Sequence, residues 1–407
     1  MKKLAVHYCG WGAEWPLGML ADNGKHLLFE YAPAALAQGL ELSPLHLPLR
    51  ATAFGPFPDF QWGLPGLIAD ALPDGWGLLL MDRLFRKNGI DPARLSVLDR
   101  LAFIGARAIG GLRFVPAETL ASDGMGHGLL ELAQASQTLL KGKDVQVLKD
   151  LVRLGGSPQG ARPKVLLDYD CARAEVASGD GGMAATPWLF KFQASGEHKE
   201  VCAIEHLYAR LARDCGLDMP RTVWLDLDKN LAAFGIERFD RSEGMRVPVH
   251  TLAGALQQNF RLPSESYASL LRMTRLMTRD QRELHKAFER CVFNVLFHNR
   301  DDHTKNFSFR LDRDQRWKLA PCYDLTFNHG MGGEHAMDIA GEGRKPGKAQ
   351  LLQLAGSEGL DMALANQSLE CMAAVAANFR QIAQDYPIRT NTRKQIGAAI
   401  NAVLLLM

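Results

Sequence analysis

A polar stretch in the last third of the chain contains the residue types that phosphoryl transfer needs. Asp301 and Asn306 lie five positions apart, and Asp324 follows further along the chain. In phosphoryl transfer, one carboxylate accepts or orients the attacking hydroxyl, while an amide and a second carboxylate hold magnesium against the phosphates. The plainer interpretation is that Asp301, Asp302 and Asn306 cap and solvate a loop. The position of Asp324 favours the functional interpretation.

The elements around these residues are predicted to be a helix, a polar loop and a hairpin. Apolar residues recur at helical spacing before the loop, at Leu284, Phe288, Cys291, Val292, Val295 and Leu296. After the loop, Phe307, Phe309 and Leu311 alternate as a strand, and Trp317 and Leu319 return. Asp324 then lies where a metal-binding aspartate would follow the hairpin, and the D-x-x-x-x-N spacing equals that of a kinase catalytic loop.

Two further segments could bind a nucleotide phosphate. The small-residue segment Gly156–Lys164 enters an apolar strand, and backbone N–H groups of such a turn can approach phosphates closely. Lys191 lies in the middle of the apolar strand Trp188–Phe192, where an ammonium group needs an anion. The alternatives are a plain hairpin turn between strands for the first and an edge-strand lysine pointing to water for the second.

The segment Phe234–Arg241 lies where strand-rich sequence gives way to helical sequence. At such a boundary, the backbone and apolar surface from Glu237 to Phe239 could bind a nucleotide base. The alternative is a charge-rich linker exposed to solvent.

Composition and charge exclude several classes of protein. The 407 residues include 47 Lys and Arg against 45 Asp and Glu, so no overall positive field attracts nucleic acid. The seven cysteines are scattered without a CxxC pair, as in proteins with reduced thiols. No window approaches the roughly 18 apolar residues of a membrane span. We therefore predict a cytoplasmic globular protein with no membrane partner.

The chain is long enough for more than one core, because single cores stop growing beyond roughly 250–300 residues. Short strands (Leu4–Tyr8, Leu27–Tyr31) and helices (Leu78–Phe85, Arg94–Phe103) are predicted first. Short strands then dominate from about Val152 to Phe239, interrupted by a helix over Glu200–Cys215. From Leu252 onward, helical periodicity prevails apart from a hairpin over Asn306–Leu319.

Taken together and in order, these motifs resemble the HipA family, the serine/threonine kinase toxins of bacterial toxin–antitoxin operons. The most specific part is Asp301-x-His303-x-Lys305-Asn306 followed by Tyr323-Asp324. Further similar segments cover nearly the whole chain: Phe29–Tyr31, Leu45–Leu49, Leu72–Gly77, Gly156–Lys164, Ile236–Arg241 and Ala320–Asp324.

The resemblance implies a role for individual residues. It implies Asp301 as catalytic base, Asn306 and Asp324 as Mg²⁺ ligands, and Ser157 as a site of self-inactivating autophosphorylation. The residues it implies for ATP binding are Ser157, Pro158, Gln159, Gly160, Ala161, Lys191, Glu237, Phe239 and His303. Asp302 stands beside Asp301, so which of the two carboxylates acts is left open.

The resemblance also implies a fold and partners. The expected fold is α+β and protein-kinase-like, with a mixed α/β N-terminal module (1–115), a strand-rich ATP-binding lobe (116–239) and a helical catalytic lobe (240–407). Expected partners are a small DNA-binding antitoxin like HipB, which would provide any contact with DNA, and a protein substrate of the translation machinery.

Two other functions are weighed against the kinase. One is a metal-dependent phosphohydrolase built on Asp301, Asp302, His303 and Asp324, with His298 nearby, because carboxylate–histidine clusters bind paired metals. The other is a non-catalytic pseudokinase that keeps only the contact with an antitoxin. Substitution of Asp302 or His303 by Ala would abolish a hydrolase and leave a kinase partly active.

Overall fold

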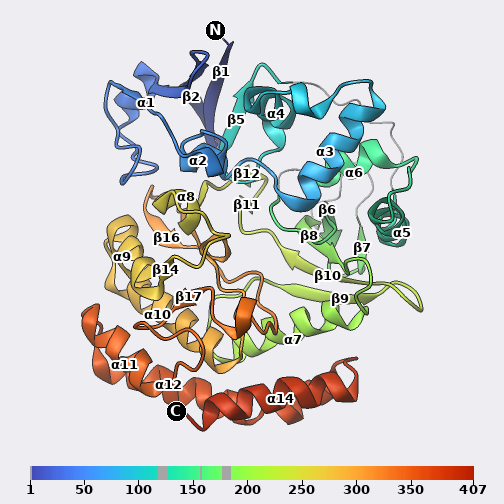
Figure 1. Cartoon of the computed structure of the whole chain (residues 1–407), viewed down its shortest axis with the longest axis vertical. Helices are drawn as coiled ribbons and strands as arrows, with labels where there is room; N and C mark the ends of the chain where they lie inside the picture. The colour runs from blue at the N-terminus through green and yellow to red at the C-terminus, as the bar shows by residue number, and fades with distance from the viewer. Residues whose placement is uncertain (1, 118–126, 156–157, 177–184) are drawn as a thin grey trace. The chain divides into compact units, whose positions relative to one another are not determined.

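The structure is a computed structural model that describes residues 2–117, 127–155, 158–176 and 185–407 (Figure 1). The chain forms two compact units. Unit 1 consists of Met1–Cys202 and Arg221–His250, and unit 2 of Ala203–Pro220 and Thr251–Met407. The predicted domain limits at 115 and 239 stay predictions.

Unit 1 begins with an antiparallel sheet of order β4-β3-β2-β1-β5. Its strands are β1 (Lys2–Gly10), β2 (Ala13–Asp22), β3 (Leu27–Tyr31), β4 (Ala53–Phe54) and β5 (Leu112–Val115). The predicted strand Leu4–Tyr8 lies within β1, whose alternate residues Leu4, Val6 and Tyr8 are buried. The accompanying helices are α1 (Pro33–Gln38), α2 (Gly66–Ala69), α3 (Gly75–Lys87) and α4 (Val97–Ile104).

The two helices predicted in this part differ from the observed ones in their limits. The predicted helix Leu78–Phe85 lies inside α3. The predicted helix Arg94–Phe103 is instead a 3₁₀ turn, Pro92–Arg94, followed by α4. The reason is Ser96, whose hydroxyl accepts a hydrogen bond from the Asp99 amide while the Asp99 carboxylate binds the Ser96 amide, so a new helix begins there.

A second sheet in unit 1 has the order β7-β6-β8-β10-β9. Its strands are β6 (Lys164–Asp170), β7 (Glu175–Val176), β8 (Thr186–Phe192), β9 (Thr222–Asp226) and β10 (Ala232–Glu237). Helices α5 (Leu129–Leu140) and α6 (Leu148–Gly155) precede it. The prediction that strands begin near Val152 is wrong, because Leu148, Leu151, Val152 and Gly155 are buried at helical spacing in α6.

The segment after β10 is hydrogen-bonded to residues 106–112 of the same unit. It contains the short strands β11 (Arg241–Ser242), β12 (Met245–Arg246) and β13 (Val249–Thr251). The guanidinium group of Arg246 donates to four carbonyl oxygens, those of Ala106 (2.7 Å), Ala108 (2.6 Å), Gly110 (2.8 Å) and Leu112 (2.9 Å). The buried Asp240 carboxylate accepts from the Gly110 amide at 3.0 Å.

The chain passes from unit 1 to unit 2 within α7 (Glu200–Asp214), which matches the predicted helix. The other helices of unit 2 are α8 (Leu252–Leu256), α9 (Tyr267–Thr278), α10 (Gln281–Leu296), α11 (Lys348–Ser357), α12 (Met362–Ala377), α13 (Phe379–Ile382) and α14 (Thr390–Leu404). Its strands are β14 (Glu265–Ser266), β15 (Ser308–Leu311), β16 (Trp317–Leu319) and β17 (Met337–Asp338). The remaining short helical turns are η1 (Asp59–Gln61), η3 (Gly105–Arg107), η4 (Thr304–Asn306), η5 (Met331–Gly333) and η6 (Ala383–Asp385).

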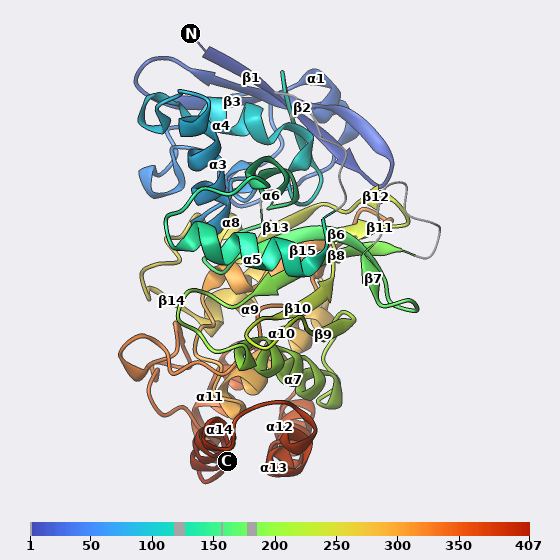
Figure 2. The same ribbon diagram turned by 90° about the vertical axis from the view of Figure 1, so that its right-hand side faces the viewer.

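Helix α10 is the centre of unit 2. It packs against α9 on one side and α12 on another, and its residues Leu284, Phe288 and Val292 are almost completely buried. Helices α11, α12 and α14 lie together beside the C-terminus in Figures 1 and 2. The predicted α+β fold, with strand-rich sequence before a helical region, is confirmed.

Two further predictions were reduced cysteine thiols and the lack of a membrane span. All seven cysteines are free thiols. In the described ranges, no helix combines the length and hydropathy needed to cross a membrane.

Candidate functional site

Helix α10 leads directly into the polar loop that contains Asp301. The helix begins at Asp280, whose side chain accepts a hydrogen bond from the Arg282 amide at 2.9 Å. It ends at Phe297, and His298 then adopts the left-handed conformation (φ 55°), which turns the chain out of the helix. The hairpin of β15 and β16 follows, paired from Phe309–Leu319 to Leu311–Trp317. The predicted order of helix, loop and hairpin is therefore confirmed.

Asp301 and Asn306 lie on one turn of this loop. The Asn306 side-chain amide donates from Nδ2 to the Asp301 carbonyl oxygen at 2.6 Å. The Asp301 side chain is 52% exposed, and its Oδ1 lies 3.8 Å from Nε2 of His303. His303 in turn contacts the Phe260 ring edge to face, with 5.3 Å between centroids. A half-exposed carboxylate of this kind is accessible to a substrate hydroxyl.

Asp302 is in the opposite situation, because its side chain is fully buried. Its Oδ2 accepts from the Tyr267 hydroxyl at 2.7 Å and lies 2.7 Å from His335 Nδ1, while Oδ1 accepts from the Ala336 amide at 2.8 Å. Burial, and secondarily the Asp302 charge, raises the pKa of Tyr267 well above its usual value, so this phenol stays a donor. Asp302 is thus held in the interior, and Asp301 is the accessible carboxylate.

The hydrolase alternative lacks the side-chain cluster that it needs. Among the residues that the structure describes, no three His, Cys, Asp or Glu side chains gather as a metal site. Asp302 is engaged in the interior by Tyr267, His335 and the Ala336 amide.

Tyr323, which precedes Asp324, is hydrogen-bonded to Lys305, which precedes Asn306. The Tyr323 hydroxyl donates to the Lys305 carbonyl oxygen at 2.8 Å and also bonds to Ser308 Oγ. Asp324 adopts the left-handed conformation with φ 56° and is half-buried. A cavity of about 10 Å³, close to the room of a single water, is lined by residues of both segments, including Asn306 and Tyr323.

Asn306 and Asp324 carry side-chain oxygens of the kinds that bind magnesium. Because Nδ2 of Asn306 is committed to the Asp301 carbonyl, its oxygen Oδ1 is the atom left to act as a ligand. Magnesium is commonly held by only one or two protein oxygens, with phosphates and water completing the octahedron. A set of one amide and one carboxylate is therefore compatible with an ion that arrives with a nucleotide.

In unit 1, Lys191 lies in the interior of the second sheet. The edge-strand interpretation is wrong, because β8 is the central strand and the Lys191 side chain is buried. Its ammonium group lies 5.8 Å from the centroid of the Phe234 ring. The ring residues Trp188, Phe190 and Phe192 are completely buried, as the predicted alternation requires.

Lys164 was not identified from the sequence as a site residue, yet the register places it directly opposite Lys191. It begins β6, pairs with Lys191 across the antiparallel ladder and is 3% exposed. Residues directly opposite each other in such a ladder project from the same face of the sheet. In the sequence, the position of Lys164 at the start of an apolar strand, two residues before Leu166, could have indicated this residue.

The small-residue loop connects helix α6 to strand β6, so the hairpin-turn interpretation is wrong. Gly156 and Ser157 lie outside the described residues. Pro158 is buried, and the Gln159 side chain donates to the carbonyl oxygens of Asp70 (3.4 Å) and Leu72 (3.3 Å). The Lys164 ammonium group donates to the Gln159 carbonyl oxygen.

The segment Asp70–Trp76 also holds the following part of this loop. The Gly160 amide donates to Asp74 Oδ1, and the Trp76 amide donates to the Gly160 carbonyl oxygen at 3.2 Å. The Trp76 indole donates to the Lys164 carbonyl oxygen at 3.0 Å. Gly75 has φ 36°, and a Cβ added there would lie 2.8 Å from Ala161 Cα. The loop is thus packed against a segment that lies far from it in sequence.

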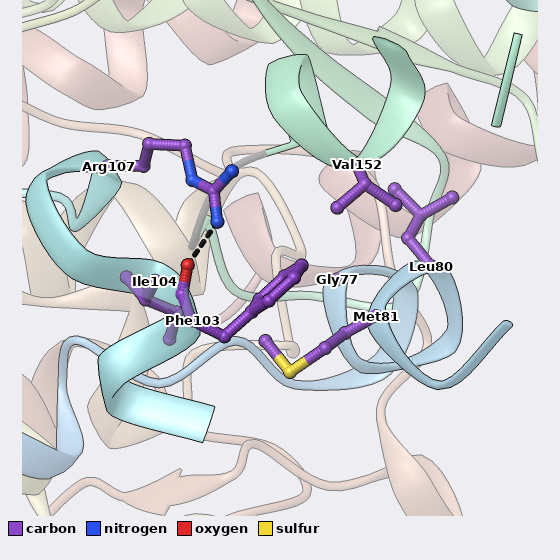
Figure 3. Close-up of a pocket in the computed structure, with 7 residues that line it drawn as sticks. All are labelled: Gly77, Leu80, Met81, Phe103, Ile104, Arg107 and Val152. Carbon is purple, nitrogen blue, oxygen red and sulfur yellow. Dashed lines mark hydrogen bonds between the residues drawn. The ribbon is translucent and has the colours of Figure 1, made fainter. Parts of the chain in front are cut away.

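A neighbouring cavity in unit 1 is too small for a nucleotide. It lies among α3, α4 and α6, is lined by Gly77, Leu80, Met81, Phe103, Ile104, Arg107 and Val152, and holds about 10 Å³ (Figure 3). Arg107 closes one side, where its guanidinium donates to the Phe103 carbonyl oxygen (Figure 3). A volume of this size accommodates about one water.

The segment around Glu237 is folded rather than a solvated linker. The amides of Glu237 and Arg238 donate to the carbonyl oxygens of Arg221 and Pro187, both at 2.9 Å. The Arg221 guanidinium binds the Glu237 carboxylate at 2.7 and 2.8 Å and holds the pKa of Glu237 below its usual value. Phe239 follows and is half-buried.

Asp240, the next acidic residue, is buried as well. Burial alone would raise its pKa, but the charges of Arg238 and Arg241 outweigh that effect and hold the pKa of Asp240 well below its usual value. The charged residues of this segment are therefore parts of the folded unit.

Comparisons with known proteins agree with this arrangement. The family model for the HipA-like C-terminal domain matches residues 156–384, and that for the HipA N-terminal domain matches residues 11–115. The chain is 27% identical over 192 residues to a Haemophilus influenzae protein named "Putative kinase", covering 42% of this chain and 52% of that protein. It is 29% identical over 275 residues to "Putative kinase Y4mE" of Sinorhizobium fredii, covering 58% of each. The matches thus span between half and three fifths of these relatives.

A solved structure shares the fold over almost the whole chain. HipA of Shewanella oneidensis, from a complex with HipB and operator DNA, matches with a TM-score of 0.72 at 20% identity. The match covers 99% of this chain and 96% of that one.

Proposed function

Because the chain belongs to the HipA family, we propose that it is a protein kinase that transfers the γ-phosphoryl group of ATP to a serine or threonine hydroxyl. The observation that supports this most directly is the hydrogen bond from Asn306 to the Asp301 carbonyl oxygen. It holds on one turn the two residues that kinase chemistry requires five positions apart, with the Asp301 carboxylate accessible.

In the proposed reaction, Asp301 accepts the proton of the attacking hydroxyl. The hydroxyl oxygen forms a bond to the γ-phosphorus, the bond from that phosphorus to the β–γ bridging oxygen breaks, and ADP leaves. Magnesium, when bound, would neutralise negative charge on the phosphates. Asn306 Oδ1 and the Asp324 carboxylate would hold that ion.

Lys191 and Lys164 would bind the phosphate oxygens of ATP. The two side chains lie opposite each other and project from the same face of the sheet, so both ammonium groups could donate to one phosphate chain. The loop Pro158–Ala161 would lie along the phosphates, and the segment Glu237–Phe239 would receive the adenine. His303, beside Asp301, would complete the nucleotide contacts.

We propose three further properties from the family. Ser157, which precedes the described part of the loop, would be the site of autophosphorylation. A small DNA-binding antitoxin would be the partner, as in the HipB-containing complex of the Shewanella protein, and would provide any contact with DNA. A component of the translation machinery would be the protein substrate. The net charge of +2 offers no direct attraction for DNA.

The test is to incubate the purified chain with Mg²⁺ and γ-labelled ATP and to map added phosphate by mass spectrometry. The parent should incorporate label, including at Ser157, and Asp301→Asn should lose roughly a thousandfold of the rate. Asp314→Asn is the matched control, because it changes an exposed aspartate in the turn between β15 and β16 of the same unit.

Other results would identify the alternatives. Release of free phosphate with no labelled protein, starting from unphosphorylated chain, would indicate the hydrolase. Binding of ATP without any turnover would indicate the pseudokinase.

A further inference from the structure

The two residues that flank Asp301 both bind one later part of unit 2. We define residues 328–344 as the distal segment. Arg300 donates from Nη2 to the Arg344 carbonyl oxygen at 2.6 Å and from Nη1 to the Gly333 carbonyl oxygen. Asp302 binds His335 and the Ala336 amide. The exposed base therefore stands between two side chains that are anchored to the same segment.

The backbone of the loop is also paired with the distal segment. Asn299 and Asn328 form an isolated parallel bridge, in which the Arg300 amide donates to Asn328 O at 3.3 Å and the Asn328 amide to His298 O at 3.2 Å. Gly330 (φ 73°) comes so close that a Cβ there would lie 2.9 Å from Arg300 Cβ. The two backbones thus run side by side up to the residue before the base.

Buried polar side chains extend this attachment to helices α9 and α10. The Tyr267 hydroxyl, which donates to Asp302, accepts from Asn294 Nδ2 at 2.9 Å. Asn294 Oδ1 accepts from Asn299 Nδ2, also at 2.9 Å. Asn294 and Asn299 are 2% exposed, and Asp302 is not exposed at all. Low-dielectric surroundings strengthen such hydrogen bonds and make a broken network unfavourable.

We propose that Asp302 and Arg300 are positioning residues for Asp301, which fix the base by clamping its loop to the distal segment. Asp302 fixes the residue after the base from inside the fold, and Arg300 fixes the residue before it. The inference rests on the proposed kinase function and assigns to Asp302 a role other than that of an alternative base. Catalytic groups must be held within a fraction of an ångström, and a 1 Å displacement can lower the rate about a hundredfold.

The first measurement is the steady-state kinetics of Asp302→Asn and Arg300→Met. Asn keeps the size of Asp302 but brings an NH₂ group to face the Tyr267 hydroxyl donor. We expect kcat to fall between about tenfold and a hundredfold in each variant. The KM for ATP should change less than kcat, because the proposed phosphate lysines are in unit 1.

Two controls separate positioning from loss of stability. Leu369→Ala removes a buried side chain of α12, and Arg272→Met removes an arginine of the same unit that binds Glu358. Leu369→Ala should lower Tm as much as Asp302→Asn or more, yet leave kcat within about twofold of the parent. If Leu369→Ala lowered kcat in proportion to Tm just as Asp302→Asn does, the role would be structural only and the proposal would be overturned.

The second measurement is hydrogen–deuterium exchange, which needs no activity. In Asp302→Asn, amides of residues 299–306 and of the distal segment should exchange faster together, with exchange in α12 unchanged. Faster exchange in only one of the two segments would overturn the clamp. A parent without phosphotransfer would end the proposed kinase function, while the exchange result would still decide whether the two segments are coupled.

Discussion

The proposed phosphate-binding residues of unit 1 and the proposed base of unit 2 are supported in different ways. Lys164 and Lys191 are buried and lie opposite each other on two neighbouring strands, and the Lys164 ammonium group donates to the Gln159 carbonyl oxygen. Asp301 is half exposed, and the neighbours on either side of it are bound to the protein itself. The first region is therefore positioned by the register of a sheet, and the second by side chains anchored to a distant segment.

The largest expected effect that tests this comparison is that of replacing Lys191. Replacing Lys191 by Met should lower kcat/KM for ATP at least about a hundredfold, because a charge beside the phosphates is lost. The ATP-free variant should still unfold cooperatively, because Met keeps most of the apolar stem of this buried side chain. Phosphotransfer kinetics and thermal unfolding without nucleotide measure the two effects.

The control for that variant is Lys229→Met, which removes an exposed lysine from the turn between β9 and β10. It should alter neither quantity. An unchanged kcat/KM for ATP in a folded Lys191→Met variant would show that Lys191 does not contact the phosphates.

A smaller effect is expected at Gly75, which lies against the loop in unit 1. In Gly75→Ala, the new Cβ would lie 2.8 Å from Ala161 Cα, so the backbone of the loop must shift. We expect the Kd for ATP to rise about tenfold, equivalent to about 1.4 kcal/mol, as measured by calorimetric titration.

Gly89→Ala provides the control for Gly75→Ala. Gly89 also has a positive φ (73°), but no atom lies within 4 Å of its added Cβ. It therefore reproduces the conformational strain without the contact. Equal ATP affinities for the two variants would show that the packing of Asp70–Trp76 against the loop does not matter for binding.

The smallest expected effect is on the free energy of unfolding at acid pH, to which the two units should contribute differently. Burial lowers the pKa of His206 in unit 2 to about 4, so the unfolded chain takes up a proton there between pH 6.5 and 4 and the folded chain does not. The free energy of unfolding should therefore fall as the pH falls through this window, by on the order of 1–3 kcal/mol. Asp240 in unit 1, whose pKa is well below its usual value, adds a loss mainly below about pH 5, where the unfolded chain begins to protonate this carboxylate and the folded chain does not.

His206→Phe tests this expectation, because it keeps a ring beside Tyr386, which lies 5.7 Å away by centroids. Denaturant unfolding at a series of pH values should give a shallower slope for the variant between pH 6.5 and 4. Parallel curves for parent and variant would contradict the assignment.

The parts of the site that sequence reasoning predicted were those with local patterns. The apolar period of α10 and the alternation after it placed Asp301, Asn306 and the hairpin correctly. Alternation also identified the faces of β8, but it does not distinguish a central strand from an edge strand, so the environment of Lys191 was misjudged. The pairing of Lys164 with Lys191 depends on the register between separated strands, which no local pattern reveals.

The distinction between Asp301 and Asp302 also depended on distant residues. Both are aspartates in the same polar loop, and only the contacts of Asp302 with Tyr267, His335 and Ala336 separate them. Those partners lie about thirty positions away on either side. A single sequence carries no signal that joins such positions, whereas the spacing of Asp301 and Asn306 is visible within six residues.

The contacts of Arg246 indicate which residues of this protein can change during evolution. Arg246 lies in the part matched by the C-terminal family model, and the carbonyl oxygens it binds lie in residues 106–112, in the part matched by the N-terminal model. A chain shortened to begin after residue 115 would keep this guanidinium and lose all four acceptors. Because those acceptors are main-chain oxygens, the joint does not depend on the side chains of Ala106, Ala108 and Leu112, whereas an added Cβ at Gly110 would lie 3.1 Å from Val249 N.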